Sequence, residues 1–218
     1  MLVNNLVLRP LLLTYHPFHF YTIYVLSRSA GYDESSAYII AYSSQQTDDA
    51  KHEHALDFIN GGRFKQVLTA HRFFDPRSIS KDVCYRIWIP FHFLPGNLGV
   101  DFYERMLTRP NSPVSRKIID DFLCSPLKPY SLHQLGIILH VYADTWSHQG
   151  FMGLIHQMND VRDIKVEGEQ DSFINNLLDD LKRDILEYAA PDLGHAQAGT
   201  IPDEPFRMWE YKDFKGRY

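Results

Sequence analysis

Apolar residues along this 218-residue chain recur mainly at the three- and four-residue spacing of amphipathic helices, and runs with the two-residue alternation of strands are nearly absent. Glycine and proline interrupt the pattern where helices are expected to end. The pattern predicts six helices, at residues 19–30, 34–59, 99–108, 113–123, 131–149 and 171–190. Loops are predicted where proline and glycine are frequent, at residues 89–96 and 194–206. We therefore expect an all-α fold, a single-domain multi-helix bundle with long loops.

The chain shows no internal repeat and no change of composition that would mark a domain boundary. We expect one domain over residues 16–218, preceded by an extension over residues 1–15. The extension is apolar, but Arg9 and Pro10 interrupt it and no basic residue precedes the apolar run, so it is a poor secretion signal. It is also shorter than the roughly 20 apolar residues that cross a bilayer. The sequence thus predicts a cytoplasmic protein with no stable membrane anchor.

The predicted helix 131–149 is apolar around most of its circumference but carries one polar stripe. At about 100° per residue, His140, Asp144 and His148 fall within an arc of about 80°, and His133 falls inside the same arc. Burying such groups is costly unless they are paired or coordinate a metal ion. The stripe therefore indicates either a metal site or a satisfied network of buried hydrogen bonds.

The spacing of the stripe limits how it can hold metal ions. His140 and His148 are separated by about 12 Å of helix rise, which is too far for these two side chains alone to coordinate one ion. Asp144 lies between them and can bridge two ions, which lie about 3.5–4 Å apart in two-metal hydrolytic sites. Other segments must complete the coordination, and the candidates are His19, Asp48, Asp49, His92 and His195, with His52, His71 and His133 as weaker ones. The alternatives are a packed core histidine for His19 and a solvated helix face for the two aspartates.

Composition and charge narrow the function classes. The chain has 11 histidines, and its 22 basic and 27 acidic residues give a net charge of −5. This charge disfavours nucleic acid as a partner, because such binding depends on basic residues that neutralise phosphates. The two cysteines, Cys84 and Cys124, are far apart and predict no thiolate metal site. Signatures of zinc proteases, serine hydrolases and P-loop enzymes are absent.

One segment, LGIILHVYADTWSHQG at residues 135–150, resembles the Leu-Gly-x-x-x-His-x-x-x-Asp-x-x-x-His helix of the superfamily that contains zinc-dependent phospholipase C and the single-strand-specific zinc nucleases. A wider resemblance rests on this helix together with HFYTIYVLSRSAGY, IAYSSQQTDDA, IPFHFLPG and GHAQAGTIPD. This ordered set looks like a bacterial family of uncharacterised proteins thought to share that fold. The resemblance covers residues 16–211 and implies an all-α fold of the same type.

In that superfamily, three zinc ions are bound in a cleft between helices. Carried over in chain order, the resemblance implies as ligands His19, Asp48 or Asp49, His71 or His92, His140, Asp144, His148 and His195. The chain departs from the pattern at two points. No tryptophan precedes Trp88 to match an N-terminal tryptophan ligand, and Gly199 stands four residues after His195, where a glutamate ligand is expected. We therefore expect one or two divalent ions, zinc in the first place and manganese, iron or magnesium as alternatives.

The function expected from these residues is that of a metal-dependent hydrolase of small phosphoesters. A metal-activated water would attack the phosphorus in a cleft beside helix 131–149. Asp48 or Asp49 is the candidate catalytic residue that orients or deprotonates this water, and Asp144 is the candidate bridge between ions. The alternative is a non-catalytic metal-binding or interaction protein that keeps the site as a structural element.

Overall fold

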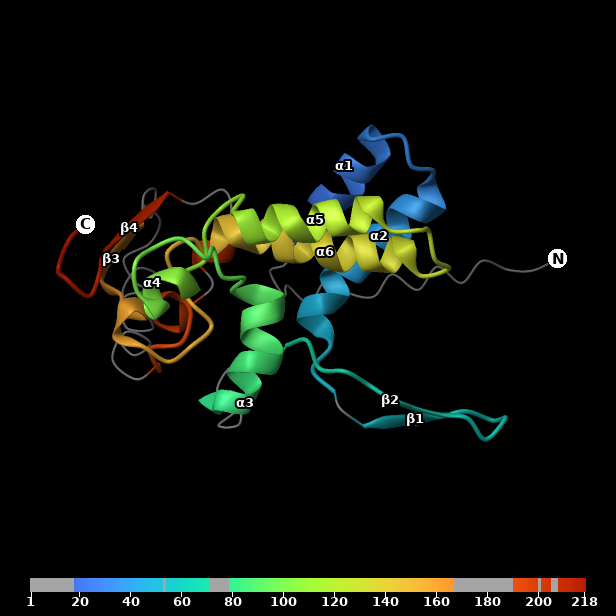
Figure 1. The fold of residues 1–218 in the computed structure, drawn as a ribbon, viewed down its shortest axis with the longest axis horizontal. Coiled ribbons are helices and arrows are strands. Elements are labelled where there is room, and N and C mark those ends of the chain that lie inside the picture. The colour runs from blue at the N-terminus through green and yellow to red at the C-terminus, as the bar shows by residue number, and fades with distance from the viewer. Residues whose placement is uncertain (1–17, 53, 71–78, 167–189, 200, 205–207) are drawn as a thin grey trace, which may run out of the picture.

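The structure is a computed structural model that describes residues 18–52, 54–70, 79–166, 190–199, 201–204 and 208–218. The extension 1–15, His71 and the helix expected at 171–190 lie outside these residues. The described helices are α1 Ile23–Ser29, α2 Glu34–Asp49, α3 Lys81–Val83, α4 Phe102–Met106, α5 Pro113–Cys124 and α6 Ser131–Ser147 (Figure 1). Two π-helical turns, Phe18–Thr22 and Cys84–His92, precede α1 and follow α3. None of the helices in these ranges is long and apolar enough to cross a lipid bilayer.

The all-α prediction was wrong, because the chain also forms two small antiparallel sheets. Strand β1 Ala55–Asp57 pairs with β2 Arg63–Lys65, and β3 Arg162–Val166 pairs with β4 Trp209–Lys212. The strands of the second sheet are short and far apart in the sequence, so no local sequence pattern predicts their pairing. The fold is therefore mixed α/β, with the helices forming its larger part.

The β1–β2 hairpin occupies the end of the helix predicted over 34–59. Helix α2 ends at Asp49, and the glycine pair at 61 and 62 turns the hairpin. Gly61 has a φ of 79°, which glycine adopts at little cost, and the Phe58 N–H donates to the Gly62 carbonyl across the turn. The prediction failed because a glycine pair after an apolar run ends a helix and turns a hairpin equally well.

The helices predicted at 19–30, 99–108, 113–123 and 131–149 lie close to their predicted positions, whereas α3 and the turn Cys84–His92 were not predicted. Helix α1 with its preceding π turn fills the predicted 19–30, and Gly31 follows with a φ of 97°. Helix α5 begins after Ser112, whose side chain accepts a hydrogen bond from the Ser115 N–H. These ends were predictable because caps and glycine stops are local signals.

Two apolar clusters form the core, one toward each end of α6. In the first, Ile23, Ile40 and Ala41 are buried, and Leu135 and Leu139 of α6 pack against them. The second contains Phe93, Phe151, Val161 and Ala198, with Trp209 and Tyr211 of β4 against it. The polar residues in the second half of α6 thus lie between two apolar cores.

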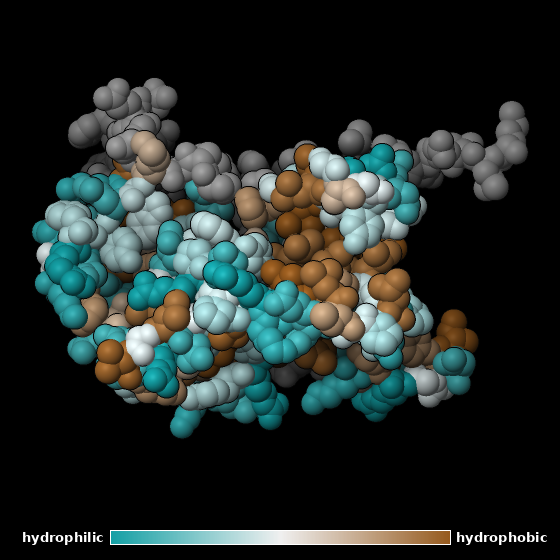
Figure 2. All heavy atoms as spheres, turned by 45° about the horizontal axis from the view of Figure 1, so that its top comes forward, coloured by the Kyte–Doolittle hydropathy of each residue, from teal (hydrophilic) through white to brown (hydrophobic). Residues whose placement is uncertain are grey.

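Not all apolar side chains join these clusters. Figure 2 shows apolar residues gathered in a patch on one face of the molecule, bordered by hydrophilic ones. Large apolar side chains are exposed on several elements, among them Val25 and Leu26 of α1, Ile59 in the β1–β2 turn and Leu123 of α5. These side chains add little to the hydrophobic stabilisation of the fold, because they stay in water.

Helix α6 packs mainly against α2, and Gly136 lies at their closest approach. A Cβ atom at Gly136 would lie 2.3 Å from the Ile40 carbonyl oxygen and 2.7 Å from the Ser43 Cβ. Both neighbours belong to a packed helix, so neither can move away easily. Glycine at this position is therefore what allows α2 to lie close enough to α6 for their polar side chains to meet.

We expect Gly136→Ala to destabilise the protein by about 1–3 kcal/mol, because overpacking at the helix contact outweighs the gain of about 1 kcal/mol in helix propensity. Urea denaturation measures the free energy of unfolding. The matched control is Gln134→Ala on the exposed face of the same helix, with an expected change within about 0.5 kcal/mol. Equal stability of the two variants would contradict this account of the contact.

Candidate metal centre

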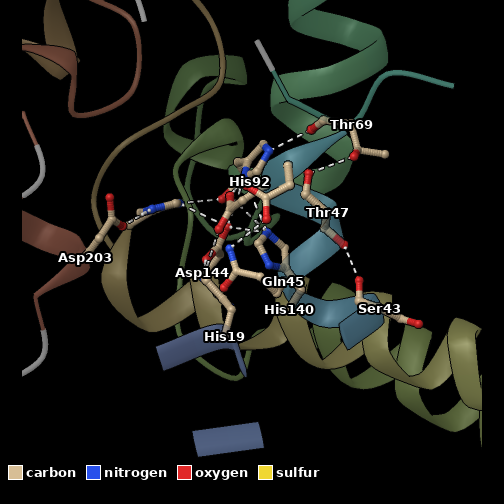
Figure 3. Close-up of polar contacts among 12 residues, drawn as sticks. His19, Ser43, Gln45, Thr47, Thr69, His92, His140, Asp144 and Asp203 are labelled. Atoms are coloured by element: carbon tan, nitrogen blue, oxygen red, sulfur yellow. Dashed lines mark hydrogen bonds and ion pairs between the residues drawn. The ribbon is translucent and has the colours of Figure 1, made fainter. Parts of the chain in front are cut away.

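Five side chains with metal-ligating atoms meet where α2 approaches α6 (Figure 3). They come from four segments: the first π turn, the last turn of α2, the end of the second π turn, and α6. In this order the residues are His19, Asp48, His92, His140 and Asp144. The structure therefore brings together residues that are more than one hundred positions apart in the sequence.

Three of these atoms form a nearly equilateral triangle. Asp144 Oδ2 lies 3.2 Å from His92 Nδ1 and 3.3 Å from His140 Nε2, and the two nitrogens are 3.4 Å apart. Ligands at bond lengths of about 2.0–2.1 Å occupy tetrahedral corners about 3.3 Å apart, which is the geometry zinc prefers. Asp48 Oδ1 lies 3.8 and 3.9 Å from the same two nitrogens. The first three atoms are thus spaced like corners of one tetrahedral site, and Asp48 Oδ1 lies close enough to two of them to be a further ligand.

The second oxygen of each carboxylate is directed to His19. Its Nε2 lies 3.0 Å from Asp144 Oδ1 and 3.9 Å from Asp48 Oδ2. Asp144 Oδ1 is buried and makes no hydrogen bond of acceptable geometry, although His19 Nε2 is close. Both carboxylates therefore divide their two oxygens between the His92–His140 pair and His19.

A further group of three side chains lies beside this cluster. His148, directly after α6, has its Nε2 2.9 Å from Asp203 Oδ1, and His195 has its Nε2 3.7 Å from Asp203 Oδ2. Asp203 ends the short helical turn Ile201–Asp203. The cluster of five residues divides into two overlapping ligand groups, one of His19, His140 and Asp144 and one of Asp48, His92 and His140. We call the set of His148, His195 and Asp203 the third ligand group, and in each group one ligand atom per residue lies within 4.8 Å of the others.

The hydrogen bonds of three histidines fix which nitrogen faces the carboxylates. His92 Nε2 lies 2.7 Å from the Thr69 carbonyl, and Nδ1 of His148 lies 2.7 Å from the His92 carbonyl. His195 Nδ1 likewise lies 2.9 Å from the Gly199 carbonyl. A carbonyl oxygen only accepts, so these nitrogens carry the hydrogen. The other nitrogen of each neutral ring then presents a lone pair to a carboxylate, which is unfavourable unless a metal ion or a proton lies between them.

Protons can supply that positive charge in the metal-free chain. Burial alone would lower the pKa of His148, but the carboxylates of Asp144 and Asp203 outweigh it and raise this pKa to about 10. Burial would raise the pKa of Asp144, but the surrounding imidazoles hold it well below its ordinary value. Burial dominates for His140 and His195 and lowers the pKa of both. A divalent ion and a proton thus compete for His148 Nε2.

His92 was predicted in a loop over 89–96 but ends the π turn Cys84–His92. Pro90 lies inside this turn, and an α-helix would lose a hydrogen bond there and crowd the preceding carbonyl. The wider turn accommodates the proline, and the Phe93 N–H donates to the carbonyl of Trp88, five residues earlier. His92 is the last residue of this turn, and its imidazole ring lies in the cluster beside Asp144.

Some predicted residues lie outside the three groups. Asp49 is exposed, and its carboxylate accepts a hydrogen bond from Gln45 Nε2 at 3.3 Å. His52 and His133 are exposed as well. Of the two adjacent aspartates, the structure therefore selects Asp48.

Asp203 is the potential metal ligand that the sequence prediction missed. An acidic residue was expected four positions after His195, where Gly199 stands, whereas Asp203 follows eight positions after His195. Two short helical turns, Ala196–Ala198 and Ile201–Asp203, belong to the segment that carries both residues. The only sequence feature that pointed to Asp203 was that it shares one proline- and glycine-rich segment with His195.

The model of a family of unknown function, DUF6765, matches residues 16–218. The chain belongs to this family. No curated protein and no solved structure matches the chain. For this DUF6765 member, function must be inferred from the geometry of the site.

We expect the chelator-treated protein to lose stability as the pH rises from 6.5 toward 10. The pKa of His148 is higher in the folded than in the unfolded chain, so its contribution is complete below pH 6.5 and disappears as pH approaches about 10. The loss is at most about 5 kcal/mol. Urea denaturation across this pH range measures it. Asp203→Asn removes one cause of the raised pKa and should flatten the curve, whereas identical slopes would contradict the assignment.

Proposed function

We propose that this protein is a metal-dependent hydrolase of phosphoesters, with two divalent ions between Asp48 and Asp144 and one more in the third ligand group. One observation carries the proposal. Each of the two carboxylates turns one oxygen toward the His92–His140 pair and the other toward His19. Carboxylates that bridge in this way are the usual means of holding two ions about 3.5–4 Å apart in hydrolytic sites.

The donor set fits zinc best. The three groups together contain more imidazoles than carboxylates. The imidazoles belong to His19, His92, His140, His148 and His195, and the carboxylates belong to Asp48, Asp144 and Asp203. Imidazole suits zinc, iron and manganese in decreasing order, while magnesium prefers an all-oxygen environment. The resemblance to the zinc phospholipase C and nuclease superfamily supports the same choice. A carboxylate ligand was expected at position 199, where the chain has glycine, and Asp203 supplies a carboxylate in its place. We therefore propose three ions, where the sequence alone predicted one or two.

Bound ions would lower the pKa of a water toward neutrality and polarise a phosphoryl oxygen. The chain itself supplies the proton acceptor and the positioning. The Asp48 side chain is 17% exposed and that of Asp144 is 2% exposed, so Asp48 lies on the solvent side of the cluster. We assign to Asp48, the more exposed of the two bridging carboxylates, the orientation and deprotonation of the attacking water as well, and to Asp144 the bridge alone. Asp144 is too buried to exchange protons with solvent.

The substrate class follows from charge and access. A phosphoester is an anion, and the metal centre is the part of the molecule that would attract it, because the net charge of the chain is −5. The same net charge disfavours a long polyanion. We therefore propose a small phosphoester as substrate.

A second candidate is a non-catalytic metal protein, and one observation favours it. His92, His140 and Asp144 are each 5% exposed or less, as in closed structural sites. Against it, the side chains of His19, Asp48 and Asp203 retain 10, 17 and 30% exposure. Solvent therefore reaches the ligands at the edge of both sites.

We expect protein purified without chelator to carry zinc, and His140→Ala to lose the two ions of the bridged site while keeping the third. Elemental analysis of the desalted protein gives the number of ions per chain. His133→Ala is the matched control, because it removes an exposed histidine from the same helix. Equal metal content in both variants, or less than one ion per wild-type chain, would refute the metal centre.

We expect Asp48→Asn to lower kcat on phosphoesters by about 100-fold or more, the usual contribution of a general base. Asp49→Asn, a change at the adjacent exposed position, should leave kcat within about twofold. Phosphodiester and phosphomonoester substrates with a chromophoric leaving group, with zinc or manganese added, provide the assay. Bound metal without turnover on any of these substrates would instead favour the non-catalytic candidate.

A further inference from the structure

Phe93 follows the ligating His92 and is buried against two other ligating histidines. Its ring centroid lies 4.7 Å from that of His148, with the planes 26° apart, and 5.8 Å from that of His195. The two imidazole centroids are 4.5 Å apart. One phenyl ring thus contacts both histidines of the third ligand group.

The Cζ end of the phenyl ring lies against Gly194, immediately before His195. A Cβ atom at Gly194 would lie 2.1 Å from Phe93 Cζ and 2.7 Å from both Cε atoms. The φ of 53° at Gly194 also favours glycine. No side chain fits between this backbone and the ring, so the Phe93 ring packs directly on the Gly194 backbone as well as on the two imidazoles.

Hydrogen bonds alone do not fix the planes of both imidazole rings. Each is anchored through Nδ1 to a single backbone carbonyl, of His92 for His148 and of Gly199 for His195. His148 Nε2 is also held, 2.9 Å from Asp203 Oδ1, whereas His195 Nε2 lies 3.7 Å from Asp203 Oδ2, beyond hydrogen-bond distance. The hydrogen bonds of His195 therefore leave its ring free to tilt, and a tilt moves its Nε2 away from Asp203. Metal ligands need this orientation fixed by their surroundings. The flat face of Phe93 is the surface that limits the tilt.

We propose that Phe93 is a positioning residue of the third ligand group: its ring, held in place by Gly194, sets the planes of His148 and His195 so that both Nε2 atoms converge on Asp203. The inference rests on the proposed function, because it requires that this group binds a metal ion. The preceding residue, His92, joins the two parts of the centre, because its Nδ1 lies beside Asp144 and its carbonyl accepts from His148 Nδ1.

The test is Phe93→Leu, which keeps an apolar side chain and removes the flat ring. We expect this variant, loaded with zinc and desalted, to bind about one ion fewer per chain, with an affinity for that ion at least about tenfold weaker. Chelator competition measures the affinity. In the cobalt-loaded protein, the absorption bands of one site should change while those of the bridged site remain. The matched control is Val161→Ala in the same apolar cluster, which should lower the melting temperature without changing metal content.

Gly194→Ala is the second variant and disturbs the same ring at its Cζ end. It should reproduce the loss of one ion even if Phe93→Leu does not fold. Wild-type zinc stoichiometry with affinities within twofold in either folded variant would overturn the positioning role and leave the proposed function intact. A wild-type chain that binds no zinc, cobalt or manganese would overturn both.

Discussion

The buried carboxylate of Asp144 is the constraint around which the centre is built. Its side chain is 2% exposed on a helix that is otherwise largely apolar, and an unpaired charge in such a place costs several kcal/mol. Nitrogens of His19, His92 and His140 surround it within 3.3 Å. These three histidines come from separate segments. Balancing the charge of the Asp144 carboxylate therefore requires the first π turn, the second π turn and α6 to pack close together.

Packing on either side holds these segments at the required distances. The apolar cluster around Ile40 fixes α2 against α6, and Gly136 lets the two backbones approach. The cluster around Phe93 and Phe151 fixes the chain that follows α6. The ligands that belong to helices and helical turns are therefore oriented by rigid elements, as a precise metal site requires. Loop ligands such as His195 depend on a hydrogen bond and on ring contacts instead.

The sequence predicted the parts of the centre that depend on local periodicity. The stripe follows from the rotation per residue of a helix, and its members His140, Asp144 and His148 are buried in the ligand groups, whereas His133 is exposed. The choice between Asp48 and Asp49 could not be made, because neighbouring helical residues point about 100° apart and only tertiary packing sets which one faces inward. The β3–β4 pairing and the approach of Asp203 to His148 are likewise contacts between distant segments, which no local pattern encodes.

The energetics of this centre point to chemistry more than to stability. Clusters of buried charged groups rarely stabilise a fold better than apolar residues of the same size would. A chain of 218 residues with two apolar cores can fold without a metal ion. A site kept only for stability would also be closed, whereas Asp48 and Asp203 leave the edges of both ligand sets open to water. The cost of collecting eight ionisable side chains therefore favours the proposed metal-dependent chemistry over a purely structural role.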